Sequence, residues 1–530
     1  MKRREFLGKS ITAAIPALIS GYAVKALDAN SPIVKALMGT GTDTDHVLVI
    51  IQLSGGNDGL NMVIPIETYN LYNAARPNIA IPEDKILRLN GYDKTGLNPA
   101  MTGLQTMYNE NKLNVIQAVG YPQPNFSHFR ATDIWQSSSN SNQEVYTGWA
   151  GRYLNYEYPN FPNGYPNASM TDPLAIQIGS TAPLTTQGPN VNMAMSITSA
   201  TNFYQLINGT SDPVPATKAG KELSFIRNVA RQTQQYAGTI KAASNKVTQQ
   251  APYPTNNSLA DQLKIVARLV KGGLTTRVYM VSFGGFDTHS LQTTVADTTL
   301  GSHAILLGRV SAAIKAFQDD LTFLGIEDRV VGMTYSEFGR RIKSNSSVGT
   351  DHGAAAPLFV FGKPVQGGVL GNNPTIPATT TFNDNVPMQY DFRSIYASLL
   401  ENWFCLPKAT VDGLFPPAIN NTLQNLPLIK GGLCKAVTPP PNPSGKTNIT
   451  NYPNPFSNKT TIEFTTTGGD TLIQIMDTAG RLLVNLLEKD YPTAGRHTVS
   501  FDASHLANGI YYARLQNGTD QQVRPMLKVR

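Results

Sequence analysis

The sequence predicts a large α/β domain, a doubly wound sheet over residues 45–435, followed by a small all-β sandwich over residues 447–530. Between about residues 46 and 437, apolar runs typical of buried strands alternate with amphipathic helical stretches. Beyond residue 446, short segments of alternating polarity are separated by turn residues, which is typical of an antiparallel sandwich. The 530 residues are too many for one ordinary core, so two domains of unequal size are expected.

In the large domain, five apolar runs predict buried parallel strands: residues 47–53, 115–119, 278–283, 330–334 and 358–361. Apolar residues at a spacing of three to four predict helices over residues 259–271 and 304–324. The region 155–215 is rich in Asn, Thr and Gly and has no strong period. It predicts an insertion or a cap over the sheet.

The charge balance does not favour a protein that binds nucleic acid. The chain has a formal net charge of +7, but residues 1–30 alone contribute +3, which leaves the remainder near +4. No block of like charges and no basic stripe with interleaved aromatic residues is present in the sequence. With 41% apolar and 15% charged residues, the composition is that of a globular protein. We therefore expect no nucleic-acid partner.

Residues 1–30 predict a removable export signal. Four basic residues among the first nine precede an apolar, small-residue stretch that runs to about residue 24. This stretch is shorter than the ~20 residues that a membrane-spanning helix needs, so no transmembrane segment is expected in the mature chain. The run RREFL at residues 3–7 resembles a twin-arginine signal, whose export route carries folded proteins. An ordinary secretory signal with adjacent arginines is the alternative.

Residues 436–446 (AVTPPPNPSGK) predict a stiff, extended linker, because proline dominates there. The tail beyond it contains turn signals such as Gly468-Gly469 and Asn508-Gly509. Its alternating segments lie at residues 460–466, 471–477, 481–487, 497–503 and 509–515. They predict a β-sandwich of about seven strands over residues 447–530.

Three motifs in this tail resemble the C-terminal sorting domain of the type IX secretion system of Bacteroidetes. They are residues 451–456 (NYPNPF), 476–481 (MDTAGR) and 509–512 (GIYY). The resemblance implies that the tail is a translocation signal without chemistry of its own. It also implies partners in the export and type IX secretion machinery, passage through the periplasm, and a final place at the cell surface or outside the cell. A generic carbohydrate-binding or structural sandwich is the alternative.

Polar segments lie where the predicted strands of the large domain end. In open α/β sheets, ligands bind beyond the carboxyl ends of the strands. Four segments follow predicted strands: residues 54–61 (SGGNDGLN), 125–129 (NFSHF), 284–289 (GGFDTH) and 336–340 (SEFGR). A fifth, residues 349–353 (GTDHG), precedes the run at 358–361. Their small residues let a ligand approach the backbone closely, so these segments are expected to converge.

The carboxylates and imidazoles in these segments predict a divalent-metal centre. Such donors suit Zn, Mn, Mg or Ca, and two ions ~3.5–4 Å apart can hold the attacking and leaving oxygens of a phosphoryl or sulfuryl transfer. A nearby serine hydroxyl would become a nucleophile. The candidate ligands are Asp58, Asp287, His289, Glu337, Asp351 and His352. The candidate catalytic residues are Ser127, His128 and Arg340.

Each segment also has a structural interpretation when taken alone. Asp58 can cap a helix after its glycine pair, and Glu337 can pair with Arg340 or Arg341. Residues 287–289 can form a polar loop, and neighbours such as Ser127 and His128 need not cooperate. The shared position of the segments at strand ends favours the joint, chemical interpretation.

The large domain resembles a bacterial family called domain of unknown function 1501, which is similar to the alkaline phosphatase and sulfatase superfamily. The resemblance covers about residues 45–410. The matching segments are residues 55–61 (GGNDGLN), 127–129 (SHF), 147–149 (TGW), 285–289 (GFDTH), 336–340 (SEFGR), 351–353 (DHG) and 391–396 (DFRSIY). The resemblance implies an alkaline-phosphatase-like sheet in which Ser127 is the nucleophile. It also implies that Asp58 and Glu337 hold one metal, while Asp287, His289 and His352 hold the other.

The chain departs from the superfamily pattern at three places. His289 lies two residues after Asp287, where alkaline phosphatases place a His after four, and Gln292 is near that position. Ser336-Glu337 replaces their adjacent Asp and His. The residues around Ser127 do not match the formylglycine motif of sulfatases. These departures disfavour sulfatase action by that route and full occupancy by two metals.

Together, these features predict an exported, metal-dependent hydrolase of phosphate or related esters, acting on a small-molecule or polymer ester. A non-catalytic surface binding protein on the same scaffold is the alternative. The two cysteines, Cys405 and Cys434, either pair in an oxidising compartment or stay free, and have no predicted catalytic role.

Overall fold

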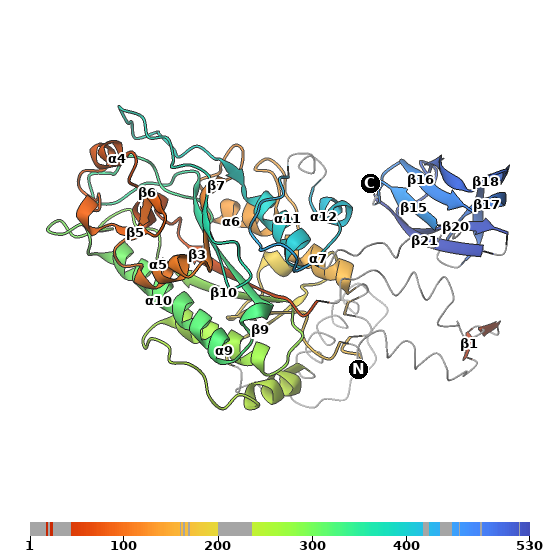
Figure 1. Cartoon of the computed structure of the whole chain (residues 1–530), viewed down its shortest axis with the longest axis horizontal. Helices are drawn as coiled ribbons and strands as arrows, with labels where there is room; N and C mark the ends of the chain where they lie inside the picture. Colours follow the sequence, from red (N-terminus) through yellow and green to blue (C-terminus); the bar gives the residue numbers. More distant parts are fainter. Residues whose placement is uncertain are drawn as a thin grey trace, which may run out of the picture. The chain divides into compact units, whose positions relative to one another are not determined.

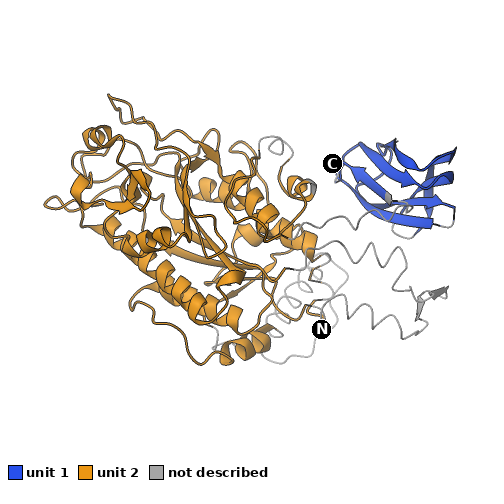
Figure 2. Cartoon of the chain, in the orientation of Figure 1, with its two compact units in different colours: residues 1–42, 435–530 blue, residues 43–434 orange. Residues whose placement is uncertain are grey.

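A computed structural model describes residues 17–19, 22–24, 44–158, 161–162, 165–167, 170–199, 236–416, 423–434, 448–454, 456–477, 480–518 and 520–529. The chain forms two compact units, shown in Figure 2: residues 43–434, and residues 435–530 together with 1–42. Most of the predicted export signal and the whole predicted linker at 436–446 lie outside the described residues. Within the signal, β1 (Ala17–Ile19) and β2 (Tyr22–Val24) pair antiparallel.

Residues 43–434 are built around a nine-stranded sheet of the described residues, in the order β13-β7-β12-β11-β3-β10-β8-β9, with β14 beside β7 (Figure 1). Its strands are β3 (Val47–Ser54), β7 (Leu113–Gly120), β8 (Ala175–Ile178), β9 (Ala194–Ile197), β10 (Val278–Gly284), β11 (Val330–Tyr335), β12 (Ala356–Phe361), β13 (Gly368–Leu370) and β14 (Tyr390–Asp391). Four of the five predicted strands are parallel, as expected.

The parallel direction predicted for residues 358–361 is wrong. Strand β12 is antiparallel to both its neighbours, β11 and β7. An apolar run shows that a strand is buried on both faces, but it carries no information on direction. The reversal matters because the beginning of β12 lies at the sheet edge where the parallel strands end. The DHG segment at 351–353 therefore reaches the same edge by preceding its strand.

Helices cover both faces of the sheet, so the doubly wound α/β prediction is confirmed (Figure 1). One face packs against α5 (Thr102–Asn109), α9 (Ser258–Lys271) and α10 (Ser302–Phe323). The other packs against α6 (His128–Ser137), α7 (Trp149–Glu157), α11 (Phe392–Asn402) and α12 (Lys408–Leu414). Successive side chains of β3 point to opposite faces of the sheet. Val47 and Val49 pack with the first set of helices, and Leu48 and Ile50 pack with the second.

The expectation of a cap at 155–215 is corrected for its described part. Strands β8 and β9 come from this region and extend the main sheet beyond β10 as parallel strands. Each has only four residues, too few to show a period in the sequence. Residues 200–235 lie outside the described part.

Smaller elements complete residues 43–434. A sheet of order β4-β6-β5 is made of β4 (Val63–Pro65), β5 (Leu87–Leu89) and β6 (Tyr92–Leu97). Near it lie α3 (Gly59–Met62), α4 (Tyr69–Ala75) and the short helix η1 (Glu83–Lys85). Two further short helices lie elsewhere: η2 (Leu184–Thr186) contacts α6 and α7, and η3 (Glu327–Arg329) contacts α10. Cys405 and Cys434 form a disulfide, which settles the pairing that the sequence left open.

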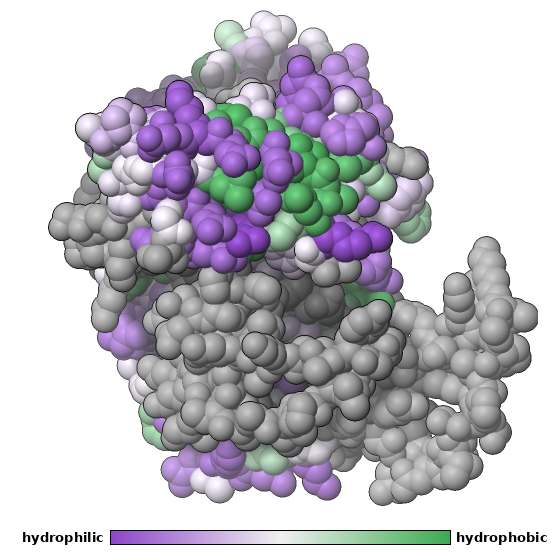
Figure 3. All heavy atoms as spheres, turned by 90° about the vertical axis from the view of Figure 1, so that its right-hand side faces the viewer, coloured by the Kyte–Doolittle hydropathy of each residue, from purple (hydrophilic) through white to green (hydrophobic). Residues whose placement is uncertain are grey.

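The second unit contains the predicted sandwich of seven strands, counted over its described residues. One sheet has the order β15-β16-β19 and the other β18-β17-β20-β21. The strands are β15 (Asn448–Tyr452), β16 (Lys459–Thr466), β17 (Gly469–Met476), β18 (Leu482–Tyr491), β19 (Gly495–Asp502), β20 (Gly509–Asn517) and β21 (Asp520–Lys528). A core that includes Phe464, Ile475 and Met526 lies between the sheets. On its surface, Figure 3 shows an apolar area bordered by polar residues, and Leu482, Ile510 and Leu527 are among the unit's exposed apolar side chains.

Candidate metal centre

Three histidines at one edge of the main sheet have their Nδ1 atoms held by fixed partners. His128 begins α6 and places Nδ1 2.8 Å from the Glu337 carboxylate, just after β11. His289 follows β10 and places Nδ1 3.2 Å from the Asp351 carboxylate. His352 precedes β12 and donates through Nδ1 to the carbonyl oxygen of Phe126 at 2.9 Å. Each contact is a hydrogen bond in the tautomer that carries its proton on Nδ1, and that tautomer leaves Nε2 with a lone pair.

The three Nε2 atoms converge on Asp287, in the loop after β10. Asp287 Oδ1 lies 3.1 Å from His289 Nε2 and 3.2 Å from His352 Nε2, and these two nitrogens are 2.9 Å apart. Asp287 Oδ2 lies 3.5 Å from His128 Nε2. His128, Asp287 and His352 also form a group whose ligand atoms lie within 4.8 Å of one another. With the proton of each imidazole on Nδ1, lone pairs this close repel one another unless a proton or a metal ion lies between them.

The spacing of these donors fits a divalent ion. Ligand bonds of about 2.0–2.2 Å separate neighbouring donors by roughly 2.8–3.6 Å in octahedral or tetrahedral coordination. The four short distances around Asp287 fall in this range. Imidazole nitrogens with one carboxylate favour Zn or Mn over the all-oxygen sites typical of Ca and Mg.

Electrostatics keep the cluster in the form that binds a cation. Burial works to raise the pKa of Asp287, but the hydrogen-bonded guanidinium of Arg340, together with His352 and His289, outweighs it, so the pKa is lowered. For Asp351, burial likewise works to raise the pKa, but hydrogen bonds from Asn345 and His289, together with the charge of Arg340, outweigh it and lower the pKa. Partial burial lowers the pKa of His352. At neutral pH, the carboxylates are therefore charged and the His352 imidazole is neutral.

Arg340, a predicted catalytic residue, is buried and positions the loops of the centre. Its guanidinium donates to the carbonyl oxygens of Gly55 and Gly56 at 2.5 Å and of Thr350 at 2.8 Å. It also donates to Asp287 Oδ1 at 2.6 Å. A single cation thus ties the segments after β3 and β10 to the loop before β12. All these donors face the protein, so the geometry favours a positioning role over direct contact with substrate.

The glycine pair after β3 allows this close packing. Gly55 and Gly56 have φ angles of +124° and +72°, which favour glycine. A Cβ at Gly55 would overlap the backbone of Asp287, and one at Gly56 would overlap the ring of Phe338. The Phe338 ring lies 4.9 Å and 4.6 Å, between centroids, from the rings of His128 and His352. Phe338 therefore holds two imidazoles in place from behind.

Asp58, predicted to hold a metal, is part of a different network. Its carboxylate accepts hydrogen bonds from Arg76 at 3.0 and 2.7 Å and from Gln292 at 2.5 Å. The side chains of Asp58 and Arg76 are 1% and 0% exposed. Burial works to raise the pKa of Asp58, but the charge of Arg76, that of His303 and the hydrogen bonds from Arg76 and Gln292 together outweigh it and lower the pKa. The cation beside Asp58 is thus a guanidinium, and the predicted pairing of Asp58 with Glu337 at one ion does not fit these contacts.

Ser127, the predicted nucleophile, is the N-cap residue of α6 and is exposed. Its backbone N–H donates to the side chain of Asn125 at 2.9 Å. Its place directly before His128 brings it to the edge of the centre. Among the described residues, its hydroxyl makes no hydrogen bond to the histidines or carboxylates of the cluster.

Several residues that organise the centre carry no signal in the sequence. Arg76 ends a short helix, and nothing around it indicates that it pairs with Asp58. Phe126 acts through a backbone carbonyl, which every residue has. His303 is 1% exposed, and its Nε2 lies 2.8 Å from Asn57 Oδ1, so burial lowers its pKa to about 4. In the sequence, Gln292 was noted only because it lies near the position after Asp287 where alkaline phosphatases place a histidine.

Comparison with known families now identifies both parts of the chain. The family described as protein of unknown function (DUF1501) matches residues 91–410, more than half of the chain. The chain belongs to the DUF1501 family. Residues 450–528 match the family described as a secretion system C-terminal sorting domain. No curated protein matches the chain.

Similar solved structures include a sulfatase from Pseudoalteromonas sp., 10% identical, with 95% of this chain and 88% of that chain covered and a TM-score of 0.30. A protein in the alkaline phosphatase superfamily from Vibrio parahaemolyticus is 8% identical over 92% and 83% of the two chains, with a TM-score of 0.33. The alkaline phosphatase from the Antarctic bacterium TAB5 is 8% identical over 60% and 91%, with a TM-score of 0.23. These likenesses are too distant to assign an activity to the DUF1501 domain.

The sorting domain determines where this DUF1501 protein acts. It directs the chain through type IX secretion to the cell surface or the extracellular space, which makes the secretion machinery a partner. No helix among the described residues has both the length and the apolar character needed to cross a membrane.

Proposed function

We propose that this chain is an exported, divalent-metal-dependent hydrolase of phosphate or related esters. The observation that carries the proposal is the convergence of the Nε2 atoms of His128, His289 and His352 on Asp287. The proposal assigns His128 to the ligands instead of to catalysis. It assigns Glu337 and Asp351 to orienting the imidazoles of His128 and His289 through their Nδ1 atoms, without direct contact with the ion.

A bound divalent ion supplies Lewis-acid polarisation of an ester oxygen and neutralises charge that develops in the transition state. The chain itself adds a second source of positive potential. Helix α6 begins at His128, so its first backbone N–H groups and its dipole favour an anionic group beside the centre. An ester of a tetrahedral oxyacid fits both features.

Ser127 is the proposed nucleophile, because its exposed position at the start of α6 lies next to a proposed ligand. Attack by its hydroxyl would form a covalent ester intermediate, which water then hydrolyses. Direct attack by water is the alternative. Ser127→Ala distinguishes the two routes. It removes the nucleophile and the covalent intermediate of the first route, whereas direct attack by water does not need the Ser127 hydroxyl.

A non-catalytic, metal-holding surface protein is the second candidate. It is favoured by the ion pair of Asp58 with Arg76, which puts an internal cation where the superfamily resemblance implied a second metal. One ion without its companion can bind an oxyanion and fail to turn it over.

The test combines metal content with turnover in protein purified from its own export route. Elemental analysis should find one divalent ion per chain, and a panel of p-nitrophenyl phosphate, bis(p-nitrophenyl) phosphate and p-nitrophenyl sulfate should show hydrolysis of at least one ester. His352→Ala should lose both ion and activity. His505→Ala is the matched control, because His505 is exposed on the sorting unit. An ion without turnover would select the binding protein, and the absence of any ion would overturn both candidates.

A further inference from the structure

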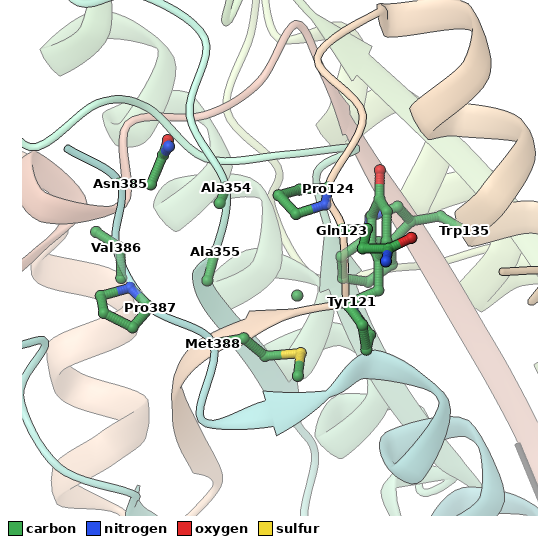
Figure 4. A pocket seen from close by; sticks show the side chains of 12 residues that line it. Tyr121, Gln123, Pro124, Trp135, Ala354, Ala355, Asn385, Val386, Pro387 and Met388 are labelled. Carbon is green, nitrogen blue, oxygen red and sulfur yellow. The ribbon is translucent and has the colours of Figure 1, made fainter. Parts of the chain in front are cut away.

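A pocket of about 290 Å³ lies at the edge of the sheet where β7 ends and β12 begins. Figure 4 shows Tyr121, Pro124 and Trp135 on one side of it, Val386 and Pro387 on the other, Ala354 and Ala355 between them, and Met388 extending below toward Tyr121. The first side comes from the β7–α6 connection and from Trp135 of α6, and the second from the segment before β14.

The pocket is continuous in sequence with the candidate metal centre. Ala354 follows His352 by two residues, so their Cα atoms are at most ~7.6 Å apart. Pro124 lies four residues before His128, and Phe126 between them accepts the hydrogen bond from His352 Nδ1. A group bound in the pocket would therefore lie beside a group held at the three imidazoles.

The lining excludes a charged occupant and favours an apolar one. Among the described residues that line the pocket, none is charged, and most are Pro, Ala, Val, Met or Trp. A charge placed there would lose its hydration without gaining a partner. Trp135 stacks on Phe392 and Tyr335 at centroid distances of 4.4 and 5.4 Å and is 3% exposed. Its faces are therefore not free to stack on a sugar ring.

Two polar atoms of the lining residues lack partners in the described part of the protein. Trp135 Nε1 is a buried donor, and Asn385 Oδ1 is a buried acceptor. Buried polar atoms normally have a hydrogen-bond partner, because leaving one unmade costs ~1–3 kcal/mol. Both atoms are shielded from solvent as the side chains lie, so the apolar lining, and not these two atoms, determines what the pocket can bind.

We propose that this pocket binds the uncharged, largely apolar organic group of the ester whose oxyacid group is held at the metal centre. That the pocket binds an uncharged, largely apolar group rests on the pocket alone. That this group belongs to an ester held at the metal centre rests on the proposed function. A cavity of about 150 Å³ is known to hold a benzene ring. The pocket here has room for a larger group, such as a pair of fused rings.

Binding is tested first, without any turnover. The probe is 1-naphthol, titrated into the full chain by isothermal calorimetry, with methyl glucoside as the polar comparison. We expect 1-naphthol to bind and methyl glucoside not to bind. Met388→Trp should weaken 1-naphthol at least about tenfold by filling the pocket, and Met388→Ala should weaken it less by removing contacts. Met388 is 38% exposed at the rim, so neither change should unfold the protein.

The matched control is Phe323→Trp, which adds an exposed indole on α10. It should leave 1-naphthol binding unchanged. The pocket inference is overturned if 1-naphthol does not bind, if only methyl glucoside binds, or if Met388→Trp and Phe323→Trp have equal effects.

Turnover then tests the link to the centre. The ratio of kcat/KM for 1-naphthyl phosphate to that for methyl phosphate should fall about tenfold in Met388→Trp. An unchanged ratio would separate the pocket from the ester and overturn the inference, while hydrolysis itself would leave the proposed function standing. Naphthol binding without hydrolysis of any ester would instead defeat the proposed function and keep the pocket as an apolar binding site.

Discussion

Asp58 and Asp287 are both aspartates that follow central parallel strands, β3 and β10, yet their surroundings differ in kind. Asp58 is 1% exposed and has its charge balanced by the buried guanidinium of Arg76. Asp287 has a side chain that is 48% exposed, and three imidazole nitrogens face it at 3.1 to 3.5 Å. Both carboxylates pair with a buried guanidinium, Asp58 with Arg76 and Asp287 with Arg340, but only Asp287 is also partly exposed and faced by imidazole nitrogens.

The difference teaches that position at a strand end does not by itself make a ligand. The two carboxylates differ in the groups that surround them: Arg76 binds both oxygens of Asp58, whereas Arg340 binds only Oδ1 of Asp287. Arg76 satisfies both oxygens of Asp58, so adding an ion there would bring two cations together in a buried site. Around Asp287, the Nδ1 contacts remove protons from the inward nitrogens, and an ion relieves the repulsion that remains.

The largest expected effect is on folding. Asp58→Asn should lower the free energy of unfolding by about 3–5 kcal/mol, because it leaves the Arg76 charge buried without a partner. Asp287→Asn also removes the carboxylate that pairs with the buried Arg340, but the Asp287 side chain is 48% exposed and the guanidinium keeps its carbonyl acceptors, so this change should cost less. Both are measured by denaturant unfolding in the presence of a chelator, so that metal binding does not contribute to stability.

Metal content completes this contrast. Asp58→Asn should keep its ion, and Asp287→Asn should lose it. The double variant Asp58→Asn, Arg76→Met should recover part of the stability lost by Asp58→Asn alone, because it removes the unpaired charge. Loss of the ion in Asp58→Asn with little change in stability would reverse the assignment of the two carboxylates.

The sequence predicted well which segments meet at the carboxyl ends of the parallel strands, and less well what each residue does there. Apolar runs located β3, β7, β10 and β11, since a strand buried on both faces needs such a run. The polar segments after them came together because parallel strands end at a common edge. The partner of each carboxylate was not predictable, because Arg76 reaches Asp58 through tertiary packing and leaves no spacing pattern. Glu337 and Asp351 were predicted as ligands, and the structure places each of them at the Nδ1 atom of a histidine. Residue type alone does not tell a ligand from a group that orients one.

A second contrast concerns histidines. His303 is buried on the Asp58 side, and burial lowers its pKa to about 4, whereas the histidines around Asp287 are partly exposed. In the unfolded chain, the pKa of His303 is about 6.5. Between these values, the unfolded state binds the proton and the folded state does not. Stability from this group is thus complete above pH 6.5 and is lost as pH falls toward 4, by about 1.4 kcal/mol per pH unit.

His303→Gln should remove this part of the acid sensitivity, because a neutral amide does not titrate and can still donate to Asn57. The measurement is the free energy of unfolding between pH 7 and pH 4, in chelator. His505→Gln, an exposed change, should leave the slope as it is. A slope that persists in His303→Gln would show that other groups, such as the cluster at Asp287, dominate the acid response.

The smallest expected effects come from the carboxylates that hold imidazoles. Glu337→Gln and Asp351→Asn should each lower metal affinity by about 10- to 100-fold without abolishing binding, because each keeps an acceptor near Nδ1 but loses the charge that orients the ring. Titration against a competing chelator measures this, with the exposed Asp328→Asn as the control. If Glu337→Gln lost the ion entirely while Asp287→Asn kept it, the direct ligand would be the buried carboxylate. The ion would then lie on the other side of His128, between Glu337 and the glycine pair, where Gly55 N–H now donates to Glu337 at 2.9 Å.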